Sequence, residues 1–267
     1  LDAYRMSANN DAELAIIEKD AGNLLSAIAP EDLLSRLDAC PAEVLMRHPT
    51  ALLVLMRRLF TWRQIPKMLQ MKALLTRAIA EKPDMTAEER GNLLGECDLI
   101  MSFLSYNDIT EMSRLHRSAS RQMTRSAVTI QAGSWTFGSP SVLMMYYRAP
   151  GELQKELHEM NECMPHYYRI TNGHGLGAEL VMAAEASFMQ GRLHEAEIGL
   201  ERARTKIAGS GQENMALCCD FLQLRLRLAA GKGRLLDMES RKQSLQARHD
   251  VVLLNMLDAI YAYYYAL

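Results

Sequence analysis

The stretch AEASFMQGRLHEAEIGLERA, residues 184–203, decides how the chain is expected to fold. Gly191 divides it into two segments. After this glycine, apolar residues recur at intervals of three and four: Leu193, Ala196, Leu200 and Ala203. Such spacing places them on one face of an α-helix. Gly191 suits a joint because glycine readily adopts the left-handed conformation that ends many helices. The stretch therefore predicts two helices joined by a short turn.

Turn-forming residues recur along the chain at a nearly constant spacing. Gly151, Gly191 and Gly231 lie 40 residues apart, Asn107 lies 44 residues before Gly151, and Arg63 lies 44 residues before Asn107. Each position falls where one helix is expected to end and its partner to begin. Repeats of about 34–47 residues with two helices per unit are typical of helical solenoids. The spacing predicts an all-α fold, an αα-hairpin superhelix of the tetratricopeptide-like α-solenoid type.

Helix start and stop signals mark further boundaries. Thr86 and Glu89 have the spacing of a capping box, in which each side chain binds the backbone of the other residue. Pro66 suits a first helical turn, where its missing N–H costs nothing. Pro83 and Pro165 are expected to end helices. These signals predict helices of about 12–20 residues with short joints, as in αα-hairpins.

The composition favours helices and a substantial buried core. Hydrophobic residues make up 49% of the chain, and 18 of its 267 residues are Met. Leu, Ala and Met outnumber Val and Ile, and the first three are strong helix formers whereas Val and Ile favour strands. A nearly all-helical chain follows from this balance.

The charge pattern and the apolar pattern exclude two classes of partner. The net charge is −2, and acidic and basic residues are interspersed. Because nucleic acids require a basic surface, we expect no direct contact with them. We also expect no membrane contact, since no apolar stretch approaches the ~20 residues that span a bilayer. The five cysteines have no regular spacing, which predicts reduced thiols and a cytoplasmic location.

Residues 184–203 resemble a tetratricopeptide repeat. Ala184 stands at the small position of the first helix, Gly191 at the turn and Ala196 at the small position of the second helix. Small residues at these positions let the two helices of a pair approach closely. Glu156 stands in the preceding unit where Ala196 stands here, so the outer units are degenerate repeats.

Three further segments resemble the helical-repeat region of large LuxR-type, MalT-like bacterial transcription regulators. They are SWTFGSPS at residues 134–141, TNGHGLGAE at residues 171–179, and His48-Pro49 at the start of a Leu-rich segment. The resemblance implies that the repeats sense an effector, either a small molecule or a protein, and control self-association into a homo-oligomer. It also implies two partners within the full-length protein, an N-terminal nucleotide-binding module and a C-terminal helix-turn-helix domain.

We expect residues 1–267 to form a single helical-repeat domain, a fragment of a longer regulator. Its parts are N-terminal helices at 1–47, degenerate repeats at 48–124, an irregular insertion at 125–148 and tetratricopeptide-like repeats at 149–267. The next joint would fall near position 271, beyond Leu267. The chain contains neither a P-loop sequence nor a basic recognition helix. The nucleotide-binding and DNA-binding functions are therefore expected in other parts of the regulator.

Candidate binding residues gather in the irregular insertion and in the unit that follows it. Insertions in solenoids lie on one face, which is often the binding face, and loops with aromatic and arginine side chains suit recognition. Pro140 is expected to open a short helix inside the insertion. The candidates for binding a ligand or a partner are Trp135, Phe137, Tyr146, Arg148, Tyr167, Tyr168, His174 and Glu179. The alternative is an insertion that only plugs the solenoid, with Trp135 buried as a wedge.

The glycine run at residues 173–177 allows two interpretations. A phosphate-binding loop of the dinucleotide type must follow a strand and open a helix, whereas here a helical segment precedes the run. We expect a joint whose glycines let two helices pack closely. An intermediate interpretation stays open, because backbone amides near Ala178 could hold an anion.

Metal-binding and catalytic patterns are weak in this sequence. His158, Glu162 and His166 recur at every fourth residue, but Pro165 is expected to displace His166, and zinc requires three or four converging ligands. A solvated polar face is the expected role of this ladder. Glu179 and Glu185 are six residues apart and point in different directions on a helix. We expect no metal, no cofactor and no catalytic residue.

Three functions compete at this point. The first is the regulatory repeat domain of a LuxR-type regulator, which binds an effector or a protein in a concave groove. The second is a generic scaffold that binds a peptide or a second copy of itself. The third, an enzyme built as an α/α toroid, needs carboxylates that face inward from several units. In all three, Gly151, Gly191, Ala196 and Gly231 are expected to be structural residues of the repeat.

Overall fold

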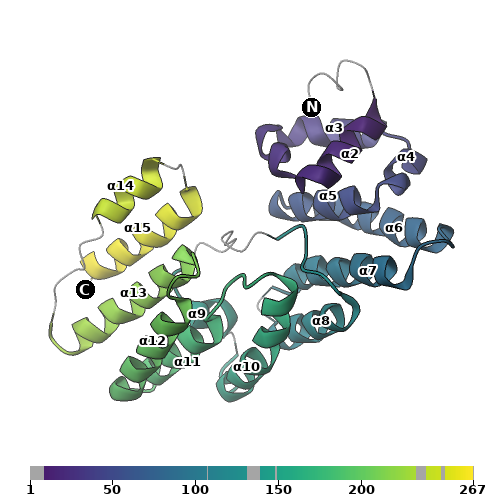
Figure 1. Cartoon of the computed structure of the whole chain (residues 1–267). Coiled ribbons are helices and arrows are strands. Elements are labelled where there is room, and N and C mark those ends of the chain that lie inside the picture. Colours follow the sequence, from purple (N-terminus) through teal and green to yellow (C-terminus); the bar gives the residue numbers. More distant parts are fainter. Residues whose placement is uncertain are drawn as a thin grey trace. The chain divides into compact units, whose positions relative to one another are not determined.

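The computed structural model is all-α in the residues that it describes, which are 9–106, 108–130, 139–147, 149–232, 239–247 and 250–266. Consecutive helices pack against one another as pairs (Figure 1). The chain divides into two compact units, one formed by residues 1–104 and 118–130 and the other by residues 105–117 and 131–267. These findings confirm the prediction of an all-α chain built from helix pairs. The assignment of residues 1–267 to a single repeat domain stays a prediction.

The first unit begins with short helices and continues with longer ones. In chain order these are α2 (Asn10–Asp20), the 3₁₀ helix η1 (Asn23–Ala27), α3 (Pro30–Ala39), α4 (Ala42–Arg47), α5 (Pro49–Thr61), α6 (Ile65–Glu81) and α7 (Ala87–Ser102). The 3₁₀ helix η2 (Phe103–Ser105) and α8 (Ile109–Gln122) contribute residues to both units. Helix α5 packs most extensively on α6 and also contacts α2, α4 and α7. It is therefore the central helix of this unit.

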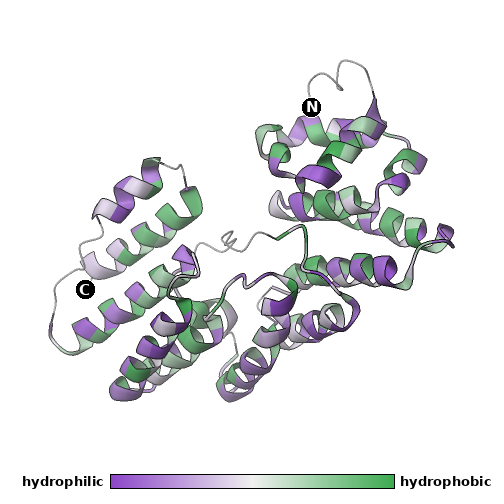
Figure 2. Cartoon of the chain, in the orientation of Figure 1, coloured by the Kyte–Doolittle hydropathy of each residue, from purple (hydrophilic) through white to green (hydrophobic). Residues whose placement is uncertain are grey.

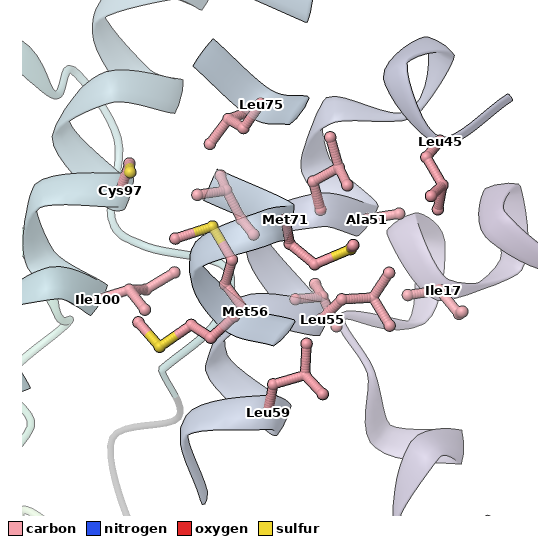
Figure 3. Close-up of a cluster of buried hydrophobic side chains, with 14 of the residues drawn as sticks. Ile17, Leu45, Ala51, Leu55, Met56, Leu59, Met71, Leu75, Cys97 and Ile100 are labelled. Carbon is pink, nitrogen blue, oxygen red and sulfur yellow. The ribbon is translucent and has the colours of Figure 1, made fainter. Parts of the chain in front are cut away.

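The core of the first unit is built around α5. The predicted apolar face of this helix is fully buried: Leu52, Leu55, Met56 and Leu59. Met71 and Leu75 of α6 and Cys97 and Ile100 of α7 pack against it (Figure 3). Along these helices hydrophobic and hydrophilic residues alternate, so that each helix has an apolar and a polar side (Figure 2). The spacing of apolar residues thus predicted this core.

The second unit continues the same arrangement. Its helices are α9 (Val142–Tyr146), α10 (Leu153–Ile170), α11 (Ala178–Met189), α12 (Leu193–Ile207), α13 (Glu213–Ala229), α14 (Glu239–Ala247) and α15 (Val251–Tyr265). Helix α11 packs most extensively on α12, as residues 184–203 predicted. Every second helix also packs on the next but one, α9 on α11, α11 on α13 and α13 on α15. These four alternate helices therefore form a stack.

Two predicted joints have the same hydrogen-bonded turn. Gly191 has φ +77° and Gly231 has φ +67°. In both turns the residue after the glycine donates its N–H to a carbonyl five residues earlier, Arg192 to Ser187 (2.9 Å) and Lys232 to Arg227 (2.8 Å). This is the Schellman motif that commonly ends helices. The two glycines therefore occupy equivalent positions in their turns.

The joint at Arg63 has the same geometry without a glycine. Arg63 has φ +58°, and the next residue, Gln64, donates its N–H to the Leu59 carbonyl at 2.9 Å. Gly151 also has a positive φ of +88°, but the N–H of Glu152 donates to Ala149, three residues earlier, at 3.3 Å. The turn at Gly151 thus differs from the other three. Asn107, the remaining predicted joint, lies outside the described residues.

Two predicted proline boundaries differ from the structure. Pro165 lies inside α10, which continues to Ile170, so the prediction that it ends a helix is wrong. Its ring removes the hydrogen bond to the carbonyl of Asn161, but both residues are exposed and water can take the place of the missing N–H. Pro140 does not open α9, since Ser141 is the N-cap of that helix and accepts the Met144 N–H. The capping box at Thr86 and Glu89 is present as predicted.

Within the described ranges, none of the helices combines the length and the apolar character needed to cross a lipid bilayer.

Candidate functional site

The predicted binding residues fall into two groups. Trp135, Phe137 and Arg148 lie outside the described residues, so the role of the insertion stays a prediction. Tyr146 lies on α9 and is 9% exposed. Burial raises the pKa of its phenol, with smaller contributions from Cys163 and Tyr106. This side chain packs inside the second unit and is not presented to solvent as a recognition element.

The other four candidates meet where α10 is joined to α11. The hydroxyl of Tyr167 and Nδ1 of His174 form a buried hydrogen bond of 2.8 Å. The hydroxyl of Tyr168 donates to the Glu179 carboxylate and accepts the Gly177 N–H at 2.9 Å. We call Tyr167, Tyr168, His174 and Glu179 the joint cluster. Each of its four side chains is thus hydrogen-bonded to the loop or to another member.

The charge in the joint cluster is balanced locally. Lys206 of α12 pairs with the Glu179 carboxylate and lies 5.1 Å from the centre of the Tyr168 ring. Burial and the neighbouring Glu179 raise the pKa of the Tyr168 phenol, so it stays protonated and acts as a hydrogen-bond donor. The cluster therefore fixes how α11 follows α10. It provides a rigid polar surface around Glu179 and Lys206, and its tyrosine is not poised for acid–base chemistry.

The glycine run is a tightly packed joint. The Gly175 N–H donates to the side-chain oxygen of Gln212 at 3.0 Å, and a Cβ atom added to Gly177 would lie 2.8 Å from Ile207. The run follows helix α10, which is not the strand context of a dinucleotide-binding loop. Glu179 already supplies a carboxylate to the first turn of α11. The structure thus favours close helix packing as the role of Gly177, whereas a Cβ at Gly173 would meet no atom within 4 Å.

The histidine ladder lies on helix α10. Because α10 continues through Pro165, His158, Glu162 and His166 belong to one uninterrupted helix, contrary to the expected displacement of His166. All three are exposed. No group of three or more His, Cys, Asp or Glu side chains in the described part of the chain could hold a metal ion.

Sequence reasoning missed a buried ion pair between α11 and α13. Glu185 is fully buried and Arg225 is 4% exposed, and their nearest charged atoms lie 3.8 Å apart. The other Glu185 oxygen accepts the N–H of Leu143 at 2.9 Å, at the start of α9. Arg225 is sandwiched by aromatic rings, 4.4 Å from the centre of Phe188 and 5.5 Å from that of Phe221. The pair thus ties three stacked first helices together.

A signal for this pair exists in the sequence. Glu185 and Arg225 each lie six residues before a turn glycine, Gly191 and Gly231. They therefore take the same position relative to the end of their helices, α11 and α13, which pack against each other. Burial raises the pKa of Glu185 to about 7, against the opposing effects of the α9 amides, Ser141 and Arg225. Glu185 thus lies inside the second unit, whereas Glu179 lies at the joint cluster.

A second missed contact joins α8 to α10. His116 Nδ1 lies 3.2 Å from Cys163 Sγ, and both residues are buried. Burial lowers the pKa of His116 to about 3 and raises the pKa of the Cys163 thiol to about 11. The pair is therefore a neutral imidazole beside a thiol. A nucleophilic cysteine needs the opposite, a lowered thiol pKa, so this contact is structural.

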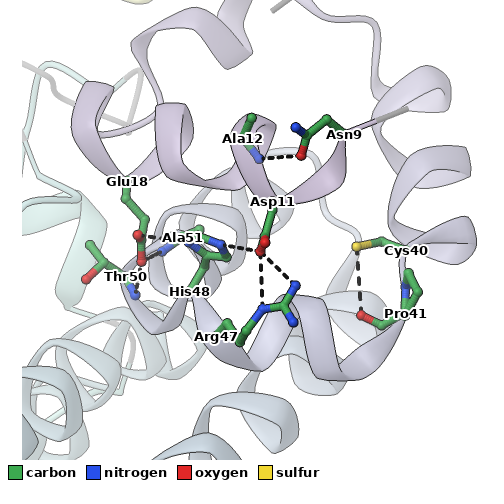
Figure 4. Close-up of polar contacts among 10 residues, drawn as sticks. All are labelled: Asn9, Asp11, Ala12, Glu18, Cys40, Pro41, Arg47, His48, Thr50 and Ala51. Atoms are coloured by element: carbon green, nitrogen blue, oxygen red, sulfur yellow. Dashed lines mark hydrogen bonds and ion pairs between the residues drawn. The ribbon is translucent and has the colours of Figure 1, made fainter. Parts of the chain in front are cut away.

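The His48-Pro49 segment is held by acidic residues of α2. Glu18 accepts the N–H of Thr50 at 3.1 Å and caps the start of α5 (Figure 4). The two ring nitrogens of His48 lie 3.1 Å from Glu18 and 3.0 Å from Asp11. The hydrogen bonds from His48 and Arg47 lower the pKa of Asp11. These contacts explain why this segment opens a helix and attach α2 to α5.

Known proteins give no further guidance to the site. Comparison with protein families, with curated proteins and with solved structures finds no match to this chain.

Proposed function

We propose that this chain is the regulatory helical-repeat region of a bacterial LuxR-type, MalT-like transcription regulator. It binds an effector or a partner protein and takes part in self-association. Its helix pairs form a tetratricopeptide-like superhelix, and it carries no catalytic residue. The nucleotide-binding and helix-turn-helix domains of the same protein are its partners within the cytoplasm.

One observation carries this proposal, the recurrence of a single turn geometry. Arg63, Gly191 and Gly231 have positive φ values and are each followed by a residue that donates to a carbonyl five positions earlier. A turn that recurs near a fixed spacing is expected of a helical-repeat array, and stacked helix pairs create extended binding surfaces. The stacking of α9, α11, α13 and α15 supports the same conclusion.

A scaffold without a small-molecule effector is the second candidate. It is favoured by exposed apolar side chains on the second unit: Met144 is 51% exposed, Met189 is 59% exposed and Tyr265 is 76% exposed. Methionine adapts its shape to different partners, and tyrosine is frequent at the centres of protein interfaces.

Thermal unfolding of the purified chain with panels of sugars, nucleotides and amino acids tests the proposal. A ligand that binds only the folded form at 100 times its Kd adds about 2.7 kcal/mol of stability. A rise in Tm with one ligand class supports the effector-binding regulator. If no class raises Tm but the chain self-associates in sedimentation experiments, the scaffold is favoured. If small-angle scattering of the purified chain showed a compact sphere, the proposed superhelix would be wrong.

A further inference from the structure

A cleft on the second unit is lined by none of the four residues of the joint cluster. It has a volume of about 320 Å³ and lies between the end of α12, the turn at residues 208–212, α13 and α14. Ligand pockets span roughly 300–1,000 Å³, so this cleft has room for a small metabolite. Its walls combine apolar side chains such as Ile207 and Ala216 with charged ones.

The charged wall of the cleft offers more N–H donors than its central carboxylate accepts. Asp220 of α13 accepts one hydrogen bond from Arg204 of α12, at 2.9 Å, and another from Arg241 of α14. Each guanidinium carries five N–H donors. Arg204 uses one nitrogen for Asp220 and for Gln223 (3.1 Å), and its buried Nε has no acceptor among the described residues. Two guanidiniums thus share one carboxylate beside an open cavity.

The arginines remain accessible from the cleft. The side chains of Arg204 and Arg241 are 36% and 39% exposed, whereas Asp220 is 14% exposed. Guanidinium groups bind carboxylate and phosphate oxygens through paired hydrogen bonds. Glu213 also lines the cleft and limits the total negative charge that a ligand can carry. The unused N–H donors of the cleft therefore suit a small anion, not a nucleic acid or another polyanion.

We infer that this cleft binds a small organic anion whose carboxylate or phosphate group accepts hydrogen bonds from Arg204 and Arg241. The apolar wall contacts the remainder of the ligand. Binding there joins α12, α13 and α14, three helices from successive pairs. The inference deepens the proposed function, on which it rests for its biological role, by naming a chemical class of effector.

Calorimetric titration with inorganic phosphate, glycerol phosphate and malate tests this site directly. We expect saturable binding of at least one probe that weakens with added salt, as for partly exposed charges. Binding of phosphate or glycerol phosphate would identify a phosphate ligand, and binding of malate would identify a carboxylate ligand. Arg241→Gln should weaken binding about tenfold or more, because a charge-assisted hydrogen bond is lost. Arg202→Gln removes a positive charge from α12 outside the cleft and should leave binding unchanged.

Asp220→Asn provides a test in the opposite direction. It removes the carboxylate that otherwise binds both arginines, so the anion should bind more tightly. This variant keeps both arginines, so it tests the site even if Arg241→Gln disturbs the position of α14. The inference is overturned if neither the wild type nor Asp220→Asn binds any of the three probes. It is also overturned if Arg241→Gln and Arg202→Gln bind alike. The titration measures anion binding to the chain directly. Anion binding can therefore be confirmed even if the proposed superhelix or regulatory function is wrong, and it can be refuted even if they are right.

Discussion

Gly199 on α12 faces Ala184 on α11 at such short range that a Cβ atom added to Gly199 would lie 2.9 Å from the Cβ of Ala184. The backbone Cα of Ala184 would be only 3.3 Å away. Neither atom belongs to a flexible side chain that could turn aside. The close approach of this helix pair therefore depends on the absence of a side chain at Gly199.

Gly199→Val should destabilise the protein by about 1–3 kcal/mol, because overpacking a helix contact forces the helices apart. Valine has a higher helix propensity than glycine, so helix propensity alone predicts a gain in stability. A lower midpoint of urea unfolding would confirm that the clash outweighs that gain.

Two further variants identify the source of this effect. Thr205→Val places the same side chain on the exposed side of α12 and should change the midpoint little. Combining Gly199→Val with Ala184→Gly should recover part of the loss, since it removes the methyl group that is struck. A double variant no more stable than Gly199→Val would show that another contact is responsible.

The turn residues provide a second prediction. Gly191→Ala and Gly231→Ala should each cost about 1 kcal/mol, since left-handed backbone is unfavourable for residues with a Cβ. No atom lies within 4 Å of a Cβ at either glycine, so the effect isolates the backbone. Arg63→Gly at the equivalent turn should not lower stability, because relief of its φ of +58° offsets the greater freedom of the unfolded chain. Thermal unfolding of the three variants is the measurement.

If Arg63→Gly lost as much stability as Gly191→Ala, the turns would not be equivalent. The Arg63 side chain would then contribute to stability itself. The recurrent turn geometry would be limited to the second unit.

Local signals predicted most of the fold. The α11–α12 pair, the buried face of α5 and the capping box at Thr86 each depend on residues within about one helical turn of each other or on a regular apolar spacing. Such patterns are visible in a sequence because they recur over short distances. The repeat pattern did not single out Gly199, which faces Ala184 at close range.

Contacts between residues far apart in the sequence could not be predicted from local patterns. Glu185 and Arg225 lie 40 residues apart, and His116 and Cys163 are separated by 47. Each side chain alone looks like an ordinary polar residue of a helix. The burial of these side chains depends on how the helices stack. The 40-residue spacing indicates which positions face each other only after the turn glycines, Gly191 and Gly231, have been matched.

The candidate site was predicted only in part for the same reason. Sequence pattern brought Tyr167, Tyr168, His174 and Glu179 together as candidates because they follow one another along the chain. It could not show that their polar atoms bind one another. The cleft depends on Arg204, Asp220 and Arg241, which come from three different helices. No sequence motif marks these residues.

Ala196 gives a third prediction. It is fully buried on α12, so Ala196→Arg should destabilise the protein by a few kcal/mol through overpacking and an unpaired buried charge. His194→Arg, at a side chain that is 86% exposed on the same helix, should leave Tm nearly unchanged. Equal melting temperatures for the two variants would place Ala196 outside the interior of the pair.

The buried pair of Glu185 and Arg225 makes stability depend on pH. Burial raises the pKa of Glu185 from 4.5 to about 7, since Arg225 at 3.8 Å makes no hydrogen bond that fully compensates. The folded chain therefore holds a proton between these pH values that the unfolded chain has released. Stability must then fall as the pH rises through this window and become level above it.

Glu185→Gln should abolish this dependence, because a carboxamide cannot ionise yet can still accept the Leu143 N–H. A pKa change from 4.5 to about 7 corresponds to about 3–4 kcal/mol, at about 1.4 kcal/mol for each unit. The stability of the wild type relative to Glu185→Gln should therefore decrease by roughly that amount between pH 4.5 and 7. Urea unfolding at a series of pH values measures the difference, with Glu197→Gln on the exposed side of α12 as the control. Parallel profiles for the wild type and Glu185→Gln would mean that Glu185 ionises as freely in the folded chain as in the unfolded one.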